Sequence, residues 1–133
     1  MQRLKPRLFT TVSLVAIFLF CFTLVVIRWL NIFNENILVV NETVNSHITN
    51  FTLSILMCVL IGNLLLTAGK KYSSTVIVGL VLILANVVYE TCFPILNTTD
   101  IVDAVYGLFG VLTSLIYLYL ISRYGFEVGK QTV

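Results

Sequence analysis

The chain has 133 residues, of which 59% are hydrophobic and 11% are charged, and its formal net charge at pH 7 is +2. Soluble domains contain roughly 45–50% apolar and about 25% charged residues, so this composition excludes a soluble globular protein and predicts a membrane protein. The small net charge gives no basis for a nucleic-acid partner. Residues 1–133 contain no long linker rich in Pro, Gly or Ser, so we expect a single domain whose main partner is the lipid bilayer.

The first predicted span covers residues 8–30. The run Leu8–Ile27 contains no charged residue and is longer than the roughly 7–15 apolar residues of a signal-peptide core, so we expect a retained transmembrane helix. Arg28 follows directly, and we interpret it as an interfacial anchor whose apolar stem stays in the membrane. A polar loop is predicted around residues 31–50.

Three further apolar segments are each about as long as the roughly 20 residues that cross a hydrocarbon core of about 30 Å. We place these spans near residues 51–68, 75–92 and 101–121. A tight connection at residues 69–72 and a short loop at residues 93–100 join them, and such short connections force neighbouring helices to run antiparallel. The predicted fold class is therefore all-α, a four-helix transmembrane bundle.

Basic and acidic residues lie at opposite ends of the predicted spans, and Lys and Arg residues that flank spans stay on the cytoplasmic side. Seven of the basic residues fall on one side, namely Arg3, Lys5, Arg7, Lys70, Lys71, Arg123 and Lys130. We therefore predict that the N and C termini are cytoplasmic. The other side holds most of the acidic residues, namely Glu35, Glu42, Glu90, Asp100 and Asp103. Acidic residues do not set topology strongly, so we interpret their asymmetry as functional.

Polar and small residues form one stripe on each of the last three spans, because residues three or four apart share a helix face. The stripes are His47, Asn50, Ser54 and Cys58; Gly79, Asn86 and Glu90; and Asp100, Asp103, Gly107, Gly110, Ser114 and Tyr117. An ionisable side chain at the membrane centre costs roughly 2.5–3.5 kcal/mol, so such side chains should face protein or a wet cavity. Turned inward, the stripes predict close backbone contact at Gly107 and Gly110 and a polar pocket open to the outside.

Four ionisable residues from three spans are the candidate catalytic or binding residues, because they share one depth near the outer face. They are His47, Glu90, Asp100 and Asp103, with Arg28, Asn50, Asn86, Gly107 and Gly110 in supporting positions. Three carboxylates and one imidazole suit a divalent cation, an acid–base pair, or a lipid or glycan headgroup. The sequence contains no named catalytic motif, so it leaves open whether the protein is an enzyme.

Each candidate also has a structural interpretation. Asp100 would serve equally well as the N-cap of the last helix, and Asp103 as a favourable charge near its N-terminus. His47 would be a hydrogen-bonded loop histidine, and Gly107 and Gly110 would be packing contacts. The convergence of four ionisable residues at one depth is what favours a site.

The order of these residues follows a pattern in which a His opens one span, a later span ends in Glu, and an Asp-x-x-Asp segment opens a last span containing Gly. Here the pattern consists of His47, Val87–Glu90, and Asp100–Asp103 followed by Gly107 and Gly110. It resembles the VanZ-like family of small integral membrane proteins. The sequence departs from that family at Val44, Phe93, Asn97–Thr99 and Gly107, where members commonly carry Lys, Gln, Arg and Asn respectively.

The resemblance implies a multi-pass protein of a bacterial cytoplasmic membrane, similar to a factor linked with resistance to the glycopeptide teicoplanin. It also implies a cell-envelope role, in which an outward-facing pocket handles an envelope lipid or glycan headgroup. Two other functions fit the same residues: a small proton-coupled transporter using Glu90, and a non-catalytic membrane subunit or assembly factor whose polar stripes only hold helices together. A transport carboxylate normally lies near the membrane midplane, whereas Glu90 is predicted near one face.

Overall fold

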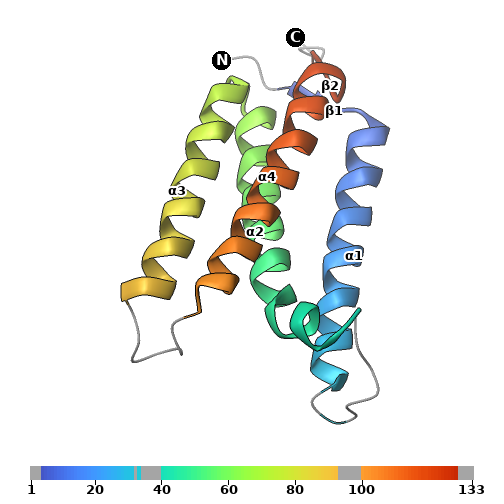
Figure 1. Cartoon of the computed structure of the whole chain (residues 1–133). Coiled ribbons are helices and arrows are strands. Elements are labelled where there is room, and N and C mark those ends of the chain that lie inside the picture. The colour runs from blue at the N-terminus through green and yellow to red at the C-terminus, as the bar shows by residue number, and fades with distance from the viewer. Residues whose placement is uncertain (1–3, 32, 34–39, 93–99, 129–133) are drawn as a thin grey trace.

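The computed structural model describes residues 4–31, 33, 40–92 and 100–128. These residues form an all-α bundle of four long helices, α1 (Leu8–Asn31), α2 (Glu42–Thr67), α3 (Tyr72–Cys92) and α4 (Ile101–Tyr124), with two short strands, β1 (Leu4–Pro6) and β2 (Phe126–Val128). Successive helices run antiparallel (Figure 1). Each helix is long and apolar enough to cross a membrane, which confirms the predicted four-span, multi-pass membrane protein.

The start of α2 is the main difference from the predicted spans. This helix begins at Glu42 rather than near residue 51, so much of the segment predicted as a polar loop is helical. The side chain of Asn41 caps the helix by accepting a hydrogen bond from the backbone N–H of Val44 at 2.8 Å. Hydropathy marks where lipid begins, whereas a cap marks where the helix begins. His47 therefore lies on helical backbone and not in a loop.

The centre of the bundle is the pair of helices α2 and α4, with α1 and α3 on either side of it (Figure 1). Nine residues of α2 and seven of α4 are buried, against two of α1 and three of α3. The outer helices instead expose large apolar side chains, such as Phe22 on α1 and Leu84 on α3, as expected for surfaces that face lipid. The residues that α2 and α4 carry on their shared face therefore define the interior.

Glycines allow α4 to approach its neighbours closely, as the sequence predicts. A Cβ atom at Gly110 would lie 2.5 Å from the backbone carbonyl oxygen of Phe51 on α2. A Cβ atom at Gly107 would collide with the side-chain amide of Asn86 on α3. Both glycines are buried, so both are packing contacts, but the predicted close approach to backbone is found at Gly110 and not at Gly107, whose neighbours are side chains.

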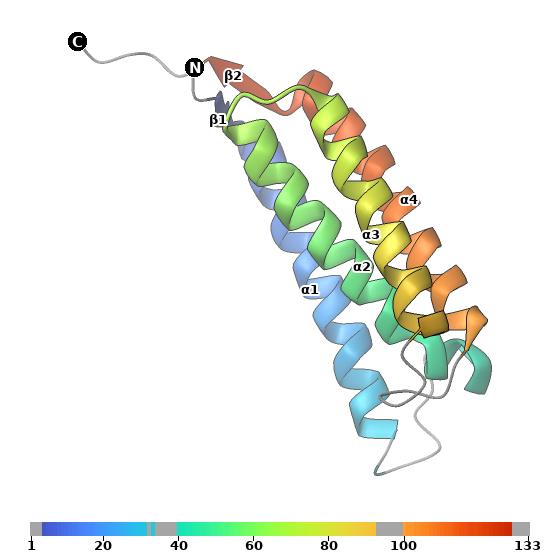
Figure 2. The same ribbon diagram turned by 90° about the vertical axis from the view of Figure 1, so that its left-hand side faces the viewer.

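A short antiparallel ribbon of β1 and β2 closes one end of the bundle, and the sequence analysis did not predict it (Figure 2). It places Lys5 opposite Glu127. Beside it, the buried hydroxyl of Thr10 donates a hydrogen bond to the carbonyl oxygen of Gly125 at 2.6 Å, and the backbone N–H of Arg7 donates to the same oxygen at 2.9 Å. The start of α1 is thereby joined to the end of α4.

Candidate functional site

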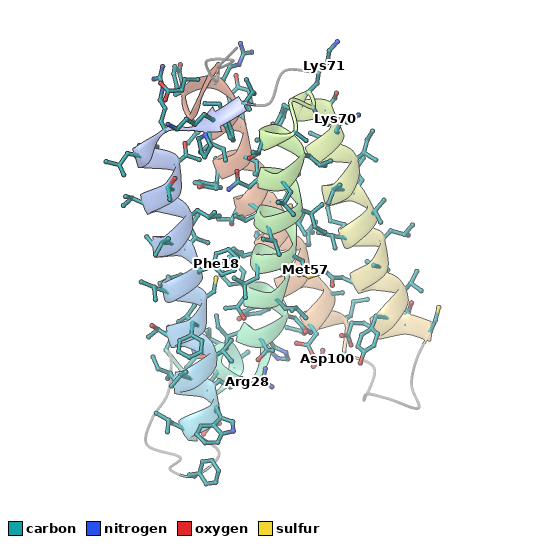
Figure 3. All side chains as sticks on the ribbon, turned by 180° about the vertical axis from the view of Figure 1, so that it is seen from behind. Phe18, Arg28, Met57, Lys70, Lys71 and Asp100 are labelled. Atoms are coloured by element: carbon teal, nitrogen blue, oxygen red, sulfur yellow. The ribbon has the colours of Figure 1, made fainter. Side chains whose placement is uncertain are left out.

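Charged residues are separated between the two ends of the bundle. Figure 3 shows Lys70 and Lys71 at one end, and Arg28 and Asp100 at the other. The end that carries the α2–α3 turn and the ribbon is named the basic end, and its described basic residues are Lys5, Arg7, Lys70, Lys71 and Arg123. The opposite end is named the acidic end, and it holds Glu42, Glu90, Asp100 and Asp103. This separation of charge agrees with the sequence analysis, whereas the membrane side that each end faces stays a prediction.

Two helices bring His47, Asp100 and Asp103 together at the acidic end. The Nδ1 atom of His47 on α2 lies 2.9 Å from Oδ1 of Asp103 on α4, and 3.8 Å from Oδ2 of Asp100. One ligand atom from each residue lies within 4.8 Å of the others. The His47 and Asp103 side chains are 13% and 17% exposed, and that of Asp100 is 39% exposed. These three residues are named the His–Asp cluster.

Asp100 makes two contacts, one that caps α4 and one toward His47. Its Oδ1 atom accepts a hydrogen bond from the backbone N–H of Val102 at 2.9 Å and caps α4. Its other carboxylate oxygen, Oδ2, is the one nearer to His47. Asp103 lies one turn further along the same helix and faces the same side. The N-cap therefore sets the start of α4 so that both carboxylates reach α2.

Glu90 lies beside the His–Asp cluster, near the end of α3, and is almost fully buried with 4% exposure. The side-chain amide of Asn50 on α2 donates a hydrogen bond to its Oε1 atom at 3.4 Å. The backbone of Asp100 also hydrogen-bonds to the carboxylate, and the charges of Asp100 and Asp103 act on it. Glu90 is thus close enough to Asp100 and Asp103 for both to act on its carboxylate. Its oxygens nevertheless lie outside the set of three ligand atoms within 4.8 Å.

A second polar layer lies further inside the bundle. The side-chain amide of Asn86 on α3 donates a hydrogen bond to the hydroxyl of Ser54 on α2 at 3.0 Å, directly against Gly107 on α4. Ser54 is buried and Asn86 is partly buried. This layer joins α2 and α3 against α4, one turn away from Glu90, and so fixes the spacing of the three helices there.

Arg28 links α1 to α2 at the acidic end. Its guanidinium donates a hydrogen bond to the hydroxyl of Thr49 and so links the end of α1 to α2. Nearby, the side-chain amide of Asn45 donates to Oδ1 of Asn31 at 3.0 Å, which adds a second link between the same helices. Among the described residues, Arg28 forms no ion pair with the acids of the His–Asp cluster. Thr49 carries no sequence signal that would have identified it as the partner.

Tyr106 is a residue of the site that the sequence analysis missed. Its ring packs on the ring of His47 with centroids 5.4 Å apart. It also lines an apolar groove of about 440 Å³ between α2 and α4, together with Ile48, Phe51, Phe109 and Thr113. Tyr106 follows Asp103 by three residues and therefore shares its helix face, a spacing that could have indicated it. Tyr106 therefore connects the groove to the His–Asp cluster.

The chemistry available to the cluster is that of hard ligands and a hydrogen-bonded imidazole. Two carboxylate oxygens and one imidazole nitrogen suit a divalent cation that completes its coordination with water or substrate oxygens. A cation bound there would displace the proton that lies between His47 and Asp103. Without a cation, Asp103 orients the imidazole, and the remaining carboxylate oxygens accept hydrogen bonds from hydroxyl or ammonium groups.

Comparisons of this chain with family models, with curated proteins and with solved structures found no match. We therefore argue its function from the contacts of the site and from the pattern of its residues.

Proposed function

We propose that this chain is a VanZ-like cell-envelope protein whose acidic end binds a polar headgroup of an envelope lipid or glycan. The observation that carries the proposal is the convergence of His47, Asp100 and Asp103, whose ligand atoms lie within 4.8 Å of one another. Glu90 adds a third carboxylate beside them. Gathering like charges in partly buried positions is unfavourable unless a cation or hydrogen-bond donors offset the repulsion. A ligand that supplies such groups would stabilise the arrangement.

The donor and acceptor chemistry of the cluster favours a headgroup rich in hydroxyl or ammonium groups. An ionised carboxylate has no proton to donate, so it can only accept hydrogen bonds. The Oδ1 atom of Asp100 already accepts one from the backbone N–H of Val102, and the Oδ1 atom of Asp103 is hydrogen-bonded to His47. The remaining oxygens are suited to sugar hydroxyls or to an amine. A divalent cation held by the same three ligand atoms would extend this range to phosphate oxygens.

The apolar groove beside the cluster favours a ligand attached to a lipid over a free glycan. The groove between α2 and α4 starts at Tyr106, which contacts His47, and continues past Phe51 and Phe109. An acyl or isoprenyl chain in the groove would place its headgroup at the His–Asp cluster. Binding of both parts would use apolar burial for affinity and the polar cluster for specificity.

The test is complementation of a strain that lacks its own copy of the protein, with teicoplanin sensitivity and the amount of protein in the membrane measured together. We expect His47→Gln and Asp103→Asn to accumulate like the wild type and to lose most of its effect on sensitivity. Glu42→Gln is the matched control, because Glu42 is an exposed acid at the same end of α2. It should behave as the wild type.

Other outcomes of this experiment contradict the proposal. If stable His47 and Asp103 variants act as the wild type, the cluster only holds helices together and the protein is an assembly factor or subunit.

The position of Glu90 does not support the transporter alternative. Proton-coupled transport needs a carboxylate that is accessible from both sides of the membrane. Glu90 instead lies two residues before α3 ends at Cys92.

A further inference from the structure

A hollow at the basic end is lined by residues that the proposed function does not use. Its volume is about 520 Å³, and it lies between the α2–α3 turn, the end of α4 and the ribbon. The lining residues that matter are Lys70, Lys71, Tyr119, Ser122, Arg123 and Phe126. The hollow lies at the end of the bundle opposite the His–Asp cluster, so it is independent of the function proposed above.

Positively charged side chains line the hollow, with no carboxylate among its described lining residues to neutralise them. Lys70, Lys71 and Arg123 line it, and no acidic residue is among the described residues that do. None of these three cations forms an ion pair within residues 4–31, 33, 40–92 and 100–128. The guanidinium carbon of Arg123 lies 5.6 Å from the centroid of the Tyr119 ring, an arrangement that holds the cation over an aromatic face. Three cations around one hollow would attract an anionic group such as a phosphate.

The backbone of the α2–α3 turn fixes the position of both lysines. The N–H of Lys70 bonds to the carbonyl of Leu65 at 3.0 Å, and the N–H of Gly69 bonds to that of Leu66 at 2.9 Å. Together with the positive φ of 76° at Gly69, these bonds form a Schellman motif that ends α2. The carbonyl of Lys71 then accepts the N–H of Ser74 at 2.9 Å at the start of α3. The lysines thus project from a rigid turn.

The opposite wall of the hollow is also built of fixed groups. The hydroxyl of Tyr72 donates a hydrogen bond to the carbonyl of Leu115 on α4 at 3.1 Å, and its ring meets the ring of Tyr119 with centroids 5.4 Å apart. Phe126 on β2 packs against the core residues at this end. The fold therefore fixes the wall formed by Tyr72 and Phe126, while the side chains of Lys70, Lys71 and Arg123 that line the hollow are exposed.

The position of the hollow along the bundle indicates which kind of molecule carries the phosphate. It lies where α2 ends, α3 begins and α4 ends, which for membrane-spanning helices is the level of lipid headgroups. Basic pockets between transmembrane helices bind the headgroups of anionic lipids. We propose that the basic end holds an anionic phospholipid through its phosphate, with Lys70, Lys71 and Arg123 as the binding residues.

The test is a lipid titration of the purified full-length protein in detergent, with the bound fraction measured by native mass spectrometry. The probes are phosphatidylglycerol, phosphatidylcholine, and, as soluble sources of the same chemistry, glycerol phosphate and inorganic phosphate. We expect phosphatidylglycerol to bind in preference to phosphatidylcholine. The Lys70→Gln/Lys71→Gln variant should bind it roughly 30-fold more weakly, and Arg123→Gln roughly fivefold more weakly.

The matched control is Lys5→Gln/Arg7→Gln, which removes two charges from the same end but leaves the hollow intact. It should bind phosphatidylglycerol like the wild type. Equal losses in both double variants, or equal binding of both lipids by the wild type, would overturn the proposal. Binding of the soluble phosphates in place of the lipid would also overturn it, by assigning the hollow to a soluble ligand. Circular dichroism checks the fold of each variant, and Arg123→Gln tests the hollow independently of the turn.

Discussion

The two ends of the bundle hold charged residues in opposite ways. At the acidic end the charges lie between helices and contact one another, as in the 2.9 Å contact of His47 with Asp103 and the buried Glu90. At the basic end, Lys70 and Lys71 are exposed on a turn whose own backbone bonds define its shape. The acidic end therefore depends on how tightly α2, α3 and α4 pack, whereas the basic end depends mainly on local structure. Changes in helix packing should therefore affect the acidic end most.

The largest effect on stability is expected for Gly110→Ala. The added Cβ meets the backbone carbonyl of Phe51, which cannot rotate away, so α2 and α4 must separate. Such overpacking typically costs about 1–3 kcal/mol and occasionally more. Thermal unfolding in detergent, followed by circular dichroism, measures the loss of stability.

Gly62→Ala on α2 is the control for this prediction. Gly62 is also buried between α2 and α4, but the three atoms that its added Cβ would approach most closely all belong to the side chain of Leu118, not to backbone. We expect a smaller loss than for Gly110→Ala. Equal losses would mean that backbone approach at Gly110 is not what limits the packing.

The second effect concerns coupling between the groups of the His–Asp cluster. We expect His47→Ala and Asp103→Ala to lower stability, and the double variant to cost less than the sum of the two. For residues in contact, such coupling is about 0.5–3 kcal/mol, and the partial exposure of both side chains favours the lower part of that range. The measurement is a double-mutant cycle of unfolding free energies in detergent.

The ribbon at the basic end offers a corresponding pair of opposite charges. Lys5 and Glu127 lie opposite each other in the ribbon, and both are exposed. The same cycle with Lys5→Ala and Glu127→Ala should give coupling near zero, because water screens exposed pairs. A stronger coupling for this pair than for the cluster would reverse the contrast between the two ends.

A third, smaller effect should be confined to the basic end. Thr10→Val keeps the side-chain volume but removes the buried hydroxyl that donates to the carbonyl of Gly125 at 2.6 Å. The loss of one such hydrogen bond costs about 0.5–1.5 kcal/mol. Hydrogen exchange read by mass spectrometry should increase in β1, β2 and the start of α1. Faster exchange around His47 would show that the two ends are coupled through the bundle.

The sequence predicted the four spans, the inward stripes and the glycine contacts, because each depends on helical periodicity and hydropathy alone. The missed features depend on pairs of distant residues. The ribbon forms because β1 and β2 meet where α1 begins and α4 ends, at the same level of the bundle. Arg28 meets Thr49 only once α1 packs on α2. The early start of α2 had a local signal, the cap at Asn41, which hydropathy overlooked.

The smallest effect on stability separates the two roles of Asp100. Asn is about as good an N-cap as Asp, so Asp100→Asn should leave the unfolding free energy nearly unchanged. Asp100→Ala removes the hydrogen bond to the backbone N–H of Val102 and should cost about 1 kcal/mol. Thermal unfolding of the two variants in detergent measures the cap contribution, which belongs to α4 alone.

Both variants remove the charge beside His47, so they should weaken function alike in the teicoplanin assay if Asp100 belongs to the His–Asp cluster. If Asp100→Asn keeps both stability and function, Asp100 is a cap only, and the acidic end reduces to His47, Asp103 and Glu90. If it keeps stability and loses function, charge at the acidic end serves binding rather than folding. That result would assign the function of the bundle to the charged contacts that distinguish the acidic end from the basic end.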